Sequence, residues 1–174
     1  MNSNIIFIVG LMGSGKTSVG KILAKKVGRN FFDTDQEIIK NEKLDISQIF
    51  NKYGEDYFRE LEHAILKRII SNEGSIVSTG GGIVLKKENI DIMKDNGIII
   101  FLNIDVETQI ARIKNKKNRP LLKNSNLEDD LKNMKNDRDK VYESISNLKI
   151  DVSGVTKYKV IDDIQIYLNE KDII

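Results

Sequence analysis

The chain has 174 residues, 40% of them hydrophobic and 31% charged, with a formal net charge of +2. This length suits one domain with a sizeable core, and the near balance of charge argues against a non-specific nucleic-acid or membrane surface. The lack of cysteine excludes disulfides, thiolate metal sites and thiol catalysis. No apolar run is long enough to span a membrane, so we expect a cytoplasmic protein without nucleic-acid or membrane partners.

The first motif is the segment Gly10–Thr17, which fits the pattern G-x-x-x-x-G-K-[ST] of a phosphate-binding loop. Its glycines allow the backbone to wrap around a polyphosphate with the N–H groups pointing inward. Lys16 adds a mobile positive charge, and Thr17 stands where its hydroxyl would bind the magnesium ion of a nucleotide. The alternative is a glycine-rich turn in an ordinary α/β crossover.

The segments on either side of this loop favour the nucleotide-binding interpretation. Ile5–Val9 is an apolar run with branched side chains, which is typical of a strand buried on both faces. After the loop, apolar residues recur at helical spacing from Val19 to Val27, and Gly28 stands where a glycine commonly ends a helix. Strand, glycine loop and helix therefore follow one another in the order that a phosphate-binding site requires.

Two carboxylates end the second predicted strand, which we place at residues 31–35. Ligands gather at the carboxyl ends of the strands in an open parallel sheet, where Asp33 and Asp35 would lie. One of them could order magnesium through water, while the other accepts a proton from an attacking hydroxyl. Alternatively, Asp35 is only the N-cap of a helix that begins near Gln36.

Residues 36–71 are predicted to form helical pieces separated by Gly54. Arg59 and Glu62 are spaced i, i+3 and can touch, and Glu62 lies on the same face as apolar residues. Since a carboxylate in that position needs a partner, we expect Glu62 to hold Arg59 toward a ligand. The alternative is a solvated surface ion pair of small value. We expect the single histidine, His63, on a helix surface.

Three consecutive glycines, Gly80–Gly82, follow the third predicted strand at residues 75–79. They are costly in backbone entropy, so a close approach of the backbone to a ligand explains them better than a plain turn does. The remaining predicted elements are a buried strand at 98–102, a helix from Val106 to Ile113, a short strand at 150–152 and a final helix from Val160 to Leu168.

The segment Lys114–Asn124 is rich in lysine and asparagine and carries Arg119 in its middle. We interpret it as a mobile lid with one anchored arginine, because a merely solvated loop would not explain its Leu121-Leu122 pair. Ser125 and Glu128 then form a capping box that opens another helix.

Arg138 falls on the apolar stripe of this helix. Arginine is scarce in this lysine-rich chain, so a site that needs a planar, bidentate fork is favoured wherever it occurs. The alternative for Arg138 is a surface arginine whose stem lies along the stripe while its charge reaches solvent.

Together these motifs resemble the shikimate kinases, within the nucleoside-monophosphate-kinase-like P-loop family. The resemblance covers nearly the whole chain and rests on Gly10–Thr17, Asp33-Thr34-Asp35, Gly54–Arg59 with Glu62, Gly80–Gly82, Arg119–Leu122, and Arg138 with Tyr142. It implies a three-layer α/β/α fold whose parallel sheet has the order 2-3-1-4-5, an acceptor-binding subdomain at about residues 33–62 and a lid at about 114–124. It also implies a monomer that transfers the γ-phosphoryl group of ATP to the 3-hydroxyl of shikimate with Mg²⁺ as cofactor.

The resemblance further implies roles for individual residues. The catalytic residues would be Lys16, Asp35 and Arg119, with Asp35 as the candidate base. ATP would be bound by Gly13, Ser14, Gly15, Lys16, Thr17, Ser18, Arg112 and Arg119. Shikimate would be bound by Asp35, Phe50, Phe58, Arg59, Gly80, Gly81, Gly82 and Arg138. Thr17 would bind the metal directly, and Asp33 and Ser78 through water. The adenine-side loop, residues 153–157, lacks the proline that the family pattern leads us to expect.

Two other functions stay open at this point. A kinase for another small acceptor, such as gluconate or a nucleoside monophosphate, would share the loop and the fold. Arg59, Glu62 and Gly80–Gly82 favour a small carboxylated polyol instead. A non-catalytic nucleotide-binding domain is the other alternative, and the presence of all three expected catalytic residues argues against it.

Overall fold

The structure is a computed structural model that describes residues 4–113 and 127–174. Within them the chain forms one sheet with the strand order β2-β3-β1-β4-β5, and every neighbouring pair is parallel. The strands are β1 (Ile5–Val9), β2 (Phe31–Asp33), β3 (Ile76–Ser78), β4 (Gly97–Asn103) and β5 (Leu148–Asp151). The expected five-stranded parallel sheet and its order are confirmed.

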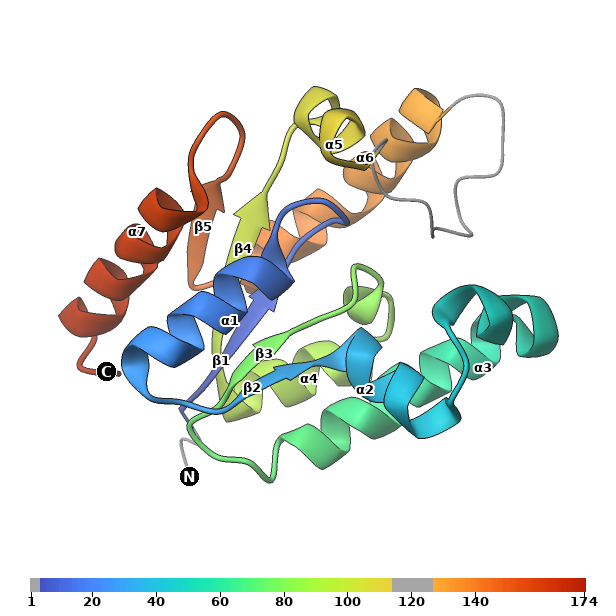
Figure 1. The fold of residues 1–174 in the computed structure, drawn as a ribbon, viewed down its shortest axis with the longest axis horizontal. Helices are drawn as coiled ribbons and strands as arrows, with labels where there is room; N and C mark the ends of the chain where they lie inside the picture. The colour runs from blue at the N-terminus through green and yellow to red at the C-terminus, as the bar shows by residue number, and fades with distance from the viewer. Residues whose placement is uncertain (1–3, 114–126) are drawn as a thin grey trace.

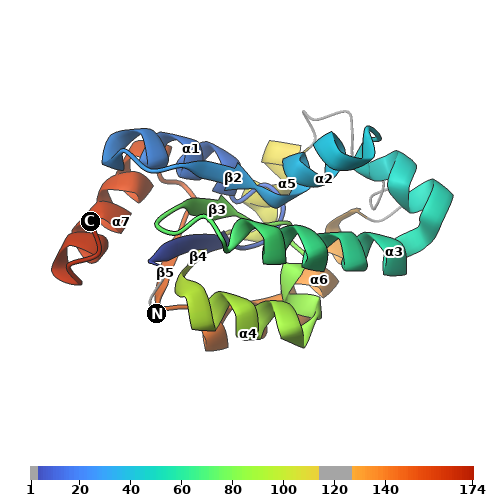
Figure 2. The ribbon, with the colours of Figure 1, turned by 90° about the horizontal axis from the view of Figure 1, so that it is seen from below.

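Helices cover both faces of this sheet, as Figures 1 and 2 show. Helices α1 and α7 pack side by side over one face, and α4 and α6 pack against β4 on the other. Helices α2 and α3 pack together beyond the β2 edge. The helices are α1 (Lys16–Val27), α2 (Thr34–Glu42), α3 (Ile46–Ile69), the 3₁₀ turn η1 (Ile83–Leu85), α4 (Lys87–Asn96), α5 (Val106–Ile113), α6 (Leu127–Ile145) and α7 (Lys157–Glu170).

The core is centred on β1, whose five residues are completely buried. This burial follows from the topology, because a parallel sheet with helices on both faces leaves no strand face to solvent. It also explains why β1 is apolar at successive positions instead of alternating. Among the described residues, no helix is long and apolar enough to cross a membrane.

The second strand is shorter than predicted, and its end decides which aspartate caps α2. The β2–β3 pairing ends at Asp33, which lies opposite Ser78. The Asp33 side chain accepts a hydrogen bond from the Gln36 backbone N–H, so Asp33 is the N-cap. Asp35 lies in the first turn of the helix. The alternative interpretation of Asp35 as a helix cap is therefore wrong.

The long helix α3 contains the predicted break. Gly54 has φ 83° and ψ 177°, a conformation that a residue with a side chain rarely adopts, and the helix changes direction there. Asp45 and Gln48 form a capping box at its start. The break places Phe50 on the first piece and Arg59 on the second. The predicted lid and the Ser125 part of the second capping box lie outside the described residues.

Candidate active site

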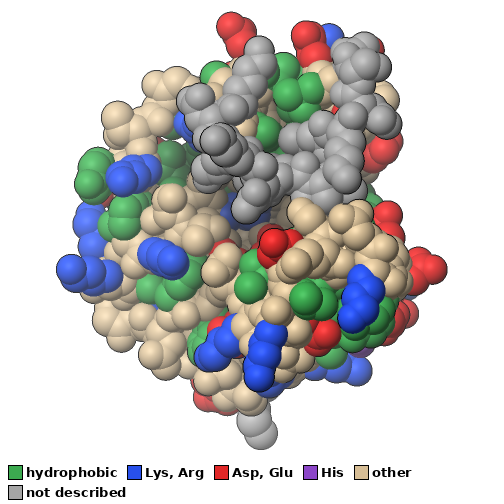
Figure 3. All heavy atoms as spheres, turned by 45° about the vertical axis from the view of Figure 1, so that its right-hand side comes forward, with side chains coloured by type: hydrophobic (Ala, Val, Ile, Leu, Met, Phe, Trp, Pro, Cys, Tyr) green, Lys and Arg blue, Asp and Glu red, His purple; other side chains and the backbone are tan. Residues whose placement is uncertain are grey.

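A cavity of about 660 Å³ opens at the carboxyl ends of β1, β2 and β3. It is lined by the phosphate-binding loop, by α2 and α3, by Gly80–Gly82 and by Arg138 from α6. Acidic and basic side chains both lie around the hollow in the face seen in Figure 3. Every predicted site residue in the described part of the chain lines this cavity except Ser78, which is buried beside it. Arg119 lies outside the described residues.

The phosphate-binding loop has the closed shape that its glycines predict. Gly10, Gly13 and Gly15 all have positive φ. A Cβ on Gly10 would stand 2.5 Å from the backbone oxygen of Leu102 in β4, so the close packing of loop and sheet also requires glycine there. The N-cap of α1, Gly15, supplies no side-chain cap. The first N–H groups of this helix and its positive dipole end therefore face the cavity, where an anion would be stabilised.

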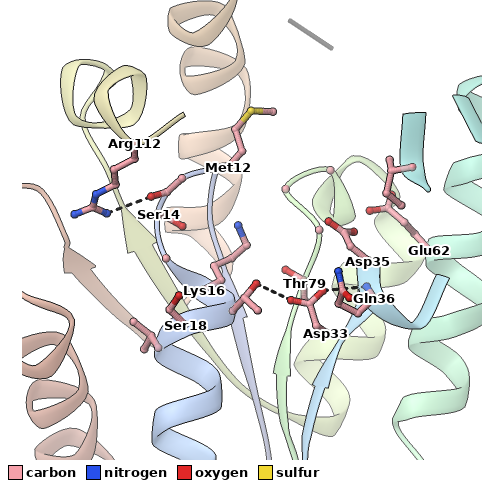
Figure 4. A pocket seen from close by; sticks show the side chains of 18 of the residues that line it. Met12, Ser14, Lys16, Ser18, Asp33, Asp35, Gln36, Glu62, Thr79 and Arg112 are labelled. Atoms are coloured by element: carbon pink, nitrogen blue, oxygen red, sulfur yellow. Dashed lines mark hydrogen bonds between the residues drawn. The ribbon is translucent and has the colours of Figure 1, made fainter. Parts of the chain in front are cut away.

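The Lys16 side chain folds back over the loop. Its ammonium group donates to the backbone oxygens of Gly10 and Leu11 at 2.8 and 3.0 Å. Lys16 and Asp35 point toward the same space from opposite sides (Figure 4). The arrangement places a cation and a carboxylate on opposite sides of one cavity.

Three oxygen-bearing side chains meet beneath the loop. The Thr17 hydroxyl donates to Asp33 at 2.7 Å and lies 3.5 Å from the Ser78 hydroxyl. Hydroxyl and carboxylate oxygens are the ligands that Mg²⁺ prefers, usually together with water and nucleotide phosphates. Among the described residues there is no cluster of three or more His, Cys, Asp or Glu side chains that could hold a metal by itself. The donor set thus fits an ion that arrives with a nucleotide.

Arg59 is held by two glutamates on its own helix. Its Nη1 forms an ion pair with Glu62 at 2.5 Å, and its Nη2 forms one with Glu55 at 2.7 Å. Glu62 is only 1% exposed, so the predicted inward pairing is confirmed and the alternative of a solvated surface pair is wrong. The second partner, Glu55, was missed, although its i, i+4 spacing from Arg59 could have indicated it.

Burial raises the pKa of Glu62 to about 7, and repulsion from Asp35 adds to the effect of burial. The charges of Arg59 and Arg138 act in the opposite direction without cancelling it. Oε1 of Glu62 has no hydrogen-bond partner among the described residues, which agrees with this cost of ionisation. Asp35 and Glu62 point toward a common space in Figure 4.

This raised pKa predicts a pH dependence of stability. Because the pKa of Glu62 in the folded chain exceeds its ordinary value of 4.5, the folded chain binds more protons than the unfolded chain between about pH 4.5 and pH 7. Stability should therefore fall as the pH rises through this window. We expect Glu62→Gln to reduce the difference in unfolding free energy between pH 5 and pH 8 by about 1 to 3 kcal/mol. Urea unfolding at both pH values tests this, and an unchanged difference in the variant would contradict it.

Two aromatic rings form an apolar wall of the cavity near Arg59. Phe50 and Phe58 approach each other from the two pieces of α3, with ring centroids 4.7 Å apart. Both line the cavity, and the Arg59 guanidinium lies 5.4 Å from the Phe58 ring centroid. An apolar wall of two tilted rings therefore lies next to the planar Arg59 guanidinium, an arrangement suited to a small ring that carries an anionic group.

The three consecutive glycines leave space for neighbouring side chains. A Cβ on Gly80 would stand 2.6 Å from carboxylate oxygens of both Asp35 and Glu62, and one on Gly82 would stand 2.1 Å from the Arg59 guanidinium. Neither glycine has a positive φ, so the backbone conformation does not explain them. A side chain at either position would instead push the Asp35, Glu62 or Arg59 side chain out of its present place. Whether the same backbone approaches a ligand remains a prediction.

Arg138 reaches the cavity from α6. Its Nη1 donates to the Gly81 carbonyl at 3.2 Å. A half-buried arginine that bonds the backbone at the cavity wall does not match the alternative of a side chain extended to solvent. Beside the phosphate-binding loop, Arg112 donates to the Gly13 carbonyl at 3.2 Å (Figure 4) and to the Val152 carbonyl at 2.9 Å.

The buried contacts of two further polar side chains were not predicted. Gln109 is fully buried on α5 and donates to the Met12 carbonyl at 2.9 Å, which helps to hold the phosphate-binding loop. His63 was expected on a helix surface, but it is half-buried and its Nδ1 lies 2.7 Å from Asn89 on α4. Neither contact has a local sequence signal, because each joins elements distant in the chain.

The parallel sheet, the phosphate-binding loop after its central strand, and the oxygen ligands beneath that loop define a P-loop kinase of the nucleoside-monophosphate-kinase type. A family model described as shikimate kinase matches residues 12–169. The chain belongs to the shikimate kinase family.

Individual comparisons agree with this assignment. The shikimate kinase of Persephonella marina is 42% identical, covering 91% of this chain and 95% of its own. That of Pelotomaculum thermopropionicum is 38% identical, covering 97% of this chain and 98% of its own. The solved structure of shikimate kinase from Acinetobacter baumannii in complex with shikimate aligns with a TM-score of 0.92 at 36% identity, covering 97% of this chain and 94% of that one.

Proposed function

We propose that this chain transfers the γ-phosphoryl group of ATP to the 3-hydroxyl of shikimate, giving shikimate 3-phosphate and ADP on the route to chorismate and the aromatic amino acids. The proposal rests on the observation that one cavity is lined by the phosphate-binding loop, by Arg59 and Arg138, and by two phenyl rings. Family membership and the relatives named above support the same reaction.

On the acceptor side, we assign Asp35 as the base that takes the proton from the attacking hydroxyl. Arg59 and Arg138 hold the acceptor's carboxylate by charge-assisted hydrogen bonds. The backbone at Gly80, Gly81 and Gly82 binds carboxylate or ring hydroxyls, and Phe50 and Phe58 pack against the ring. The lining of the cavity by all of these residues supports the assignment.

On the nucleotide side, the residues assigned to ATP are Gly13, Ser14, Gly15, Lys16, Thr17, Ser18 and Arg112, together with Arg119, which lies outside the described residues. Lys16 and Arg119 stabilise the charge that develops on the transferring group. We assign Mg²⁺ as the divalent ion, held by the Thr17 hydroxyl and, through water, by Asp33 and Ser78. This ion would neutralise phosphate charge and help to orient the transferring group.

We also propose that the enzyme acts as a monomer in the cytoplasm, with small-molecule substrates and no nucleic-acid or membrane partner. Residues 33–62 are proposed as the acceptor-binding subdomain, and their α2 and α3 segments supply Asp35, Phe50, Phe58 and Arg59 to the cavity wall. Residues 114–124 are proposed as the lid over the nucleotide.

An ADP-release assay across several acceptors tests the proposed function. The acceptors are shikimate, quinate, gluconate and nucleoside monophosphates, each with ATP and Mg²⁺. We expect turnover with shikimate to exceed that with every other acceptor, and NMR of the product to place the phosphate on the 3-hydroxyl. Faster turnover of gluconate or of a nucleoside monophosphate would reject shikimate as the substrate.

A further inference from the structure

The backbone of Gly80–Gly82 is fixed at two points by side chains from distant parts of the chain. The Gly80 N–H donates to the Thr34 hydroxyl at 2.8 Å. The Gly81 carbonyl accepts from the Tyr142 hydroxyl at 2.5 Å and from Arg138 Nη1 at 3.2 Å. Glycine residues lose more conformational freedom on folding than other residues, so a segment of three needs such anchors to hold one conformation.

Tyr142 is placed for this contact with little freedom to make another. It is completely buried, and its ring stacks on Phe101 of β4 with centroids 5.0 Å apart. Burial raises the pKa of its hydroxyl above the ordinary value, so the group stays protonated and remains a donor. Thr34, the first residue of α2, is also completely buried.

The shared carbonyl links Tyr142 to Arg138, one of the two arginines assigned to the acceptor's carboxylate. A carbonyl oxygen has two lone pairs, and the Tyr142 hydroxyl and Arg138 together occupy both. Without the hydroxyl, the Gly81 carbonyl would keep only the longer hydrogen bond from Arg138 and would be held less firmly. The Arg138 fork would then be drawn toward the protein backbone instead of toward a ligand. A change at Tyr142 should therefore reach an acceptor through Gly81 and Arg138.

We propose that Tyr142 and Thr34 are positioning residues that fix the Gly80–Gly82 backbone and the Arg138 fork for the acceptor, an inference that rests on the proposed function. Neither side chain is assigned a contact with the acceptor or with ATP. Their action is on the geometry of groups that do make such contacts, so they should affect acceptor binding and leave nucleotide binding unchanged.

The test compares Tyr142→Phe with the wild type in steady-state kinetics. Loss of one buried hydrogen bond should raise the KM for shikimate about tenfold, while the KM for ATP stays within about twofold. The matched control is Tyr167→Phe, the same chemical change on half-buried Tyr167 of α7, which lies outside the cavity. It should leave both KM values unchanged.

Thr34 provides an independent test from the other anchor. Thr34→Val removes the acceptor of the Gly80 N–H with little change in volume and should also raise the shikimate KM selectively. Thr34→Ser keeps the hydroxyl, so its KM for shikimate should stay within about threefold of the wild-type value. The two Thr34 variants therefore test the positioning role even if Tyr142→Phe folds poorly.

If Tyr142 and Thr34 only stabilised the fold, the kinetic result would be different. A lowered Tm with both KM values unchanged, or with both changed equally, would overturn the proposal. So would a shift in shikimate KM of less than about twofold in both Tyr142→Phe and Thr34→Val. Wild-type turnover of shikimate reports separately on the proposed function. If the wild type preferred another carboxylated acceptor, the same comparison made with that acceptor would still decide the role of the anchors.

Discussion

Asp35→Asn should lower turnover by about a hundredfold or more and leave the affinity for ATP nearly unchanged. The substitution preserves size and hydrogen bonding but removes the basic carboxylate. Asp35 lies against Gly80, across the cavity from Lys16 (Figure 4). It is not among the residues assigned to ATP, so the nucleotide should bind normally. Turnover at saturating ATP and shikimate, with nucleotide affinity measured separately, gives the two quantities.

Asp91→Asn is the matched control, since Asp91 is exposed on α4 and does not line the cavity. It should behave as the wild type in both measurements. Wild-type turnover in Asp35→Asn would rule out Asp35 as the base. A loss of ATP affinity as large as the loss of turnover would place its role on the nucleotide side instead.

Arg59→Lys should lower kcat/KM for shikimate by roughly thirtyfold to a thousandfold, with the KM for ATP as an internal control. The guanidinium donates one hydrogen bond to Glu62 through Nη1 and two to Glu55 through Nε and Nη2. These bonds use three of its five N–H groups and leave two for a ligand. An ammonium group cannot satisfy two glutamates and a bidentate carboxylate at once. The point charge of lysine should therefore fail to rescue acceptor binding.

Arg68→Lys provides the control on the same helix. Arg68 pairs with Glu37 at 2.8 Å, but its side chain is 53% exposed and lies outside the cavity. Because an exposed ion pair contributes little, this variant should keep kcat/KM within about twofold of the wild type. Equal losses in the two variants would show that lysine at Arg59 acts through general instability and not through the acceptor.

Local sequence signals were sufficient to predict the elements at the centre of the fold. A fully buried β1, a glycine loop and an amphipathic α1 each have a distinct pattern, and all were predicted within a few residues. The Arg59–Glu62 pair was predictable for the same reason, since both residues lie on one helix at a fixed spacing. These features depend on periodicity over one element or across one turn.

Features set by the pairing of distant segments were harder to predict. Asp33 and Asp35 are equally good helix caps locally, and only the last β2–β3 pair, Asp33 with Ser78, decides where the strand ends. Helix α4 was not predicted because its buried face includes Asn89 and lacks a continuous apolar stripe. Asn89 is satisfied by the Ile83 carbonyl and by His63, contacts that exist only in the folded chain.

In the candidate site, too, features with a local sequence signal were predicted and features that depend on distant segments were not. The residues that carry charge or lack a side chain were visible as motifs, and the cavity brings them together. Thr34, Gln109 and Tyr142 were not recognised as anchors, because each bonds a backbone atom at least 46 positions away in the sequence. A hydroxyl or an amide gives no sequence signal for such a partner.

Whether Arg59 holds the acceptor's carboxylate can be measured most directly by a double cycle that changes both enzyme and substrate. The four values are kcat/KM of the wild type and of Arg59→Lys with shikimate and with its carboxamide analogue. We expect the carboxamide to lower kcat/KM of the wild type by at least about thirtyfold and that of Arg59→Lys by less than about threefold, because both changes remove one interaction. Penalties that multiply independently would mean that Arg59 does not contact the carboxylate, which would contradict the proposed acceptor site.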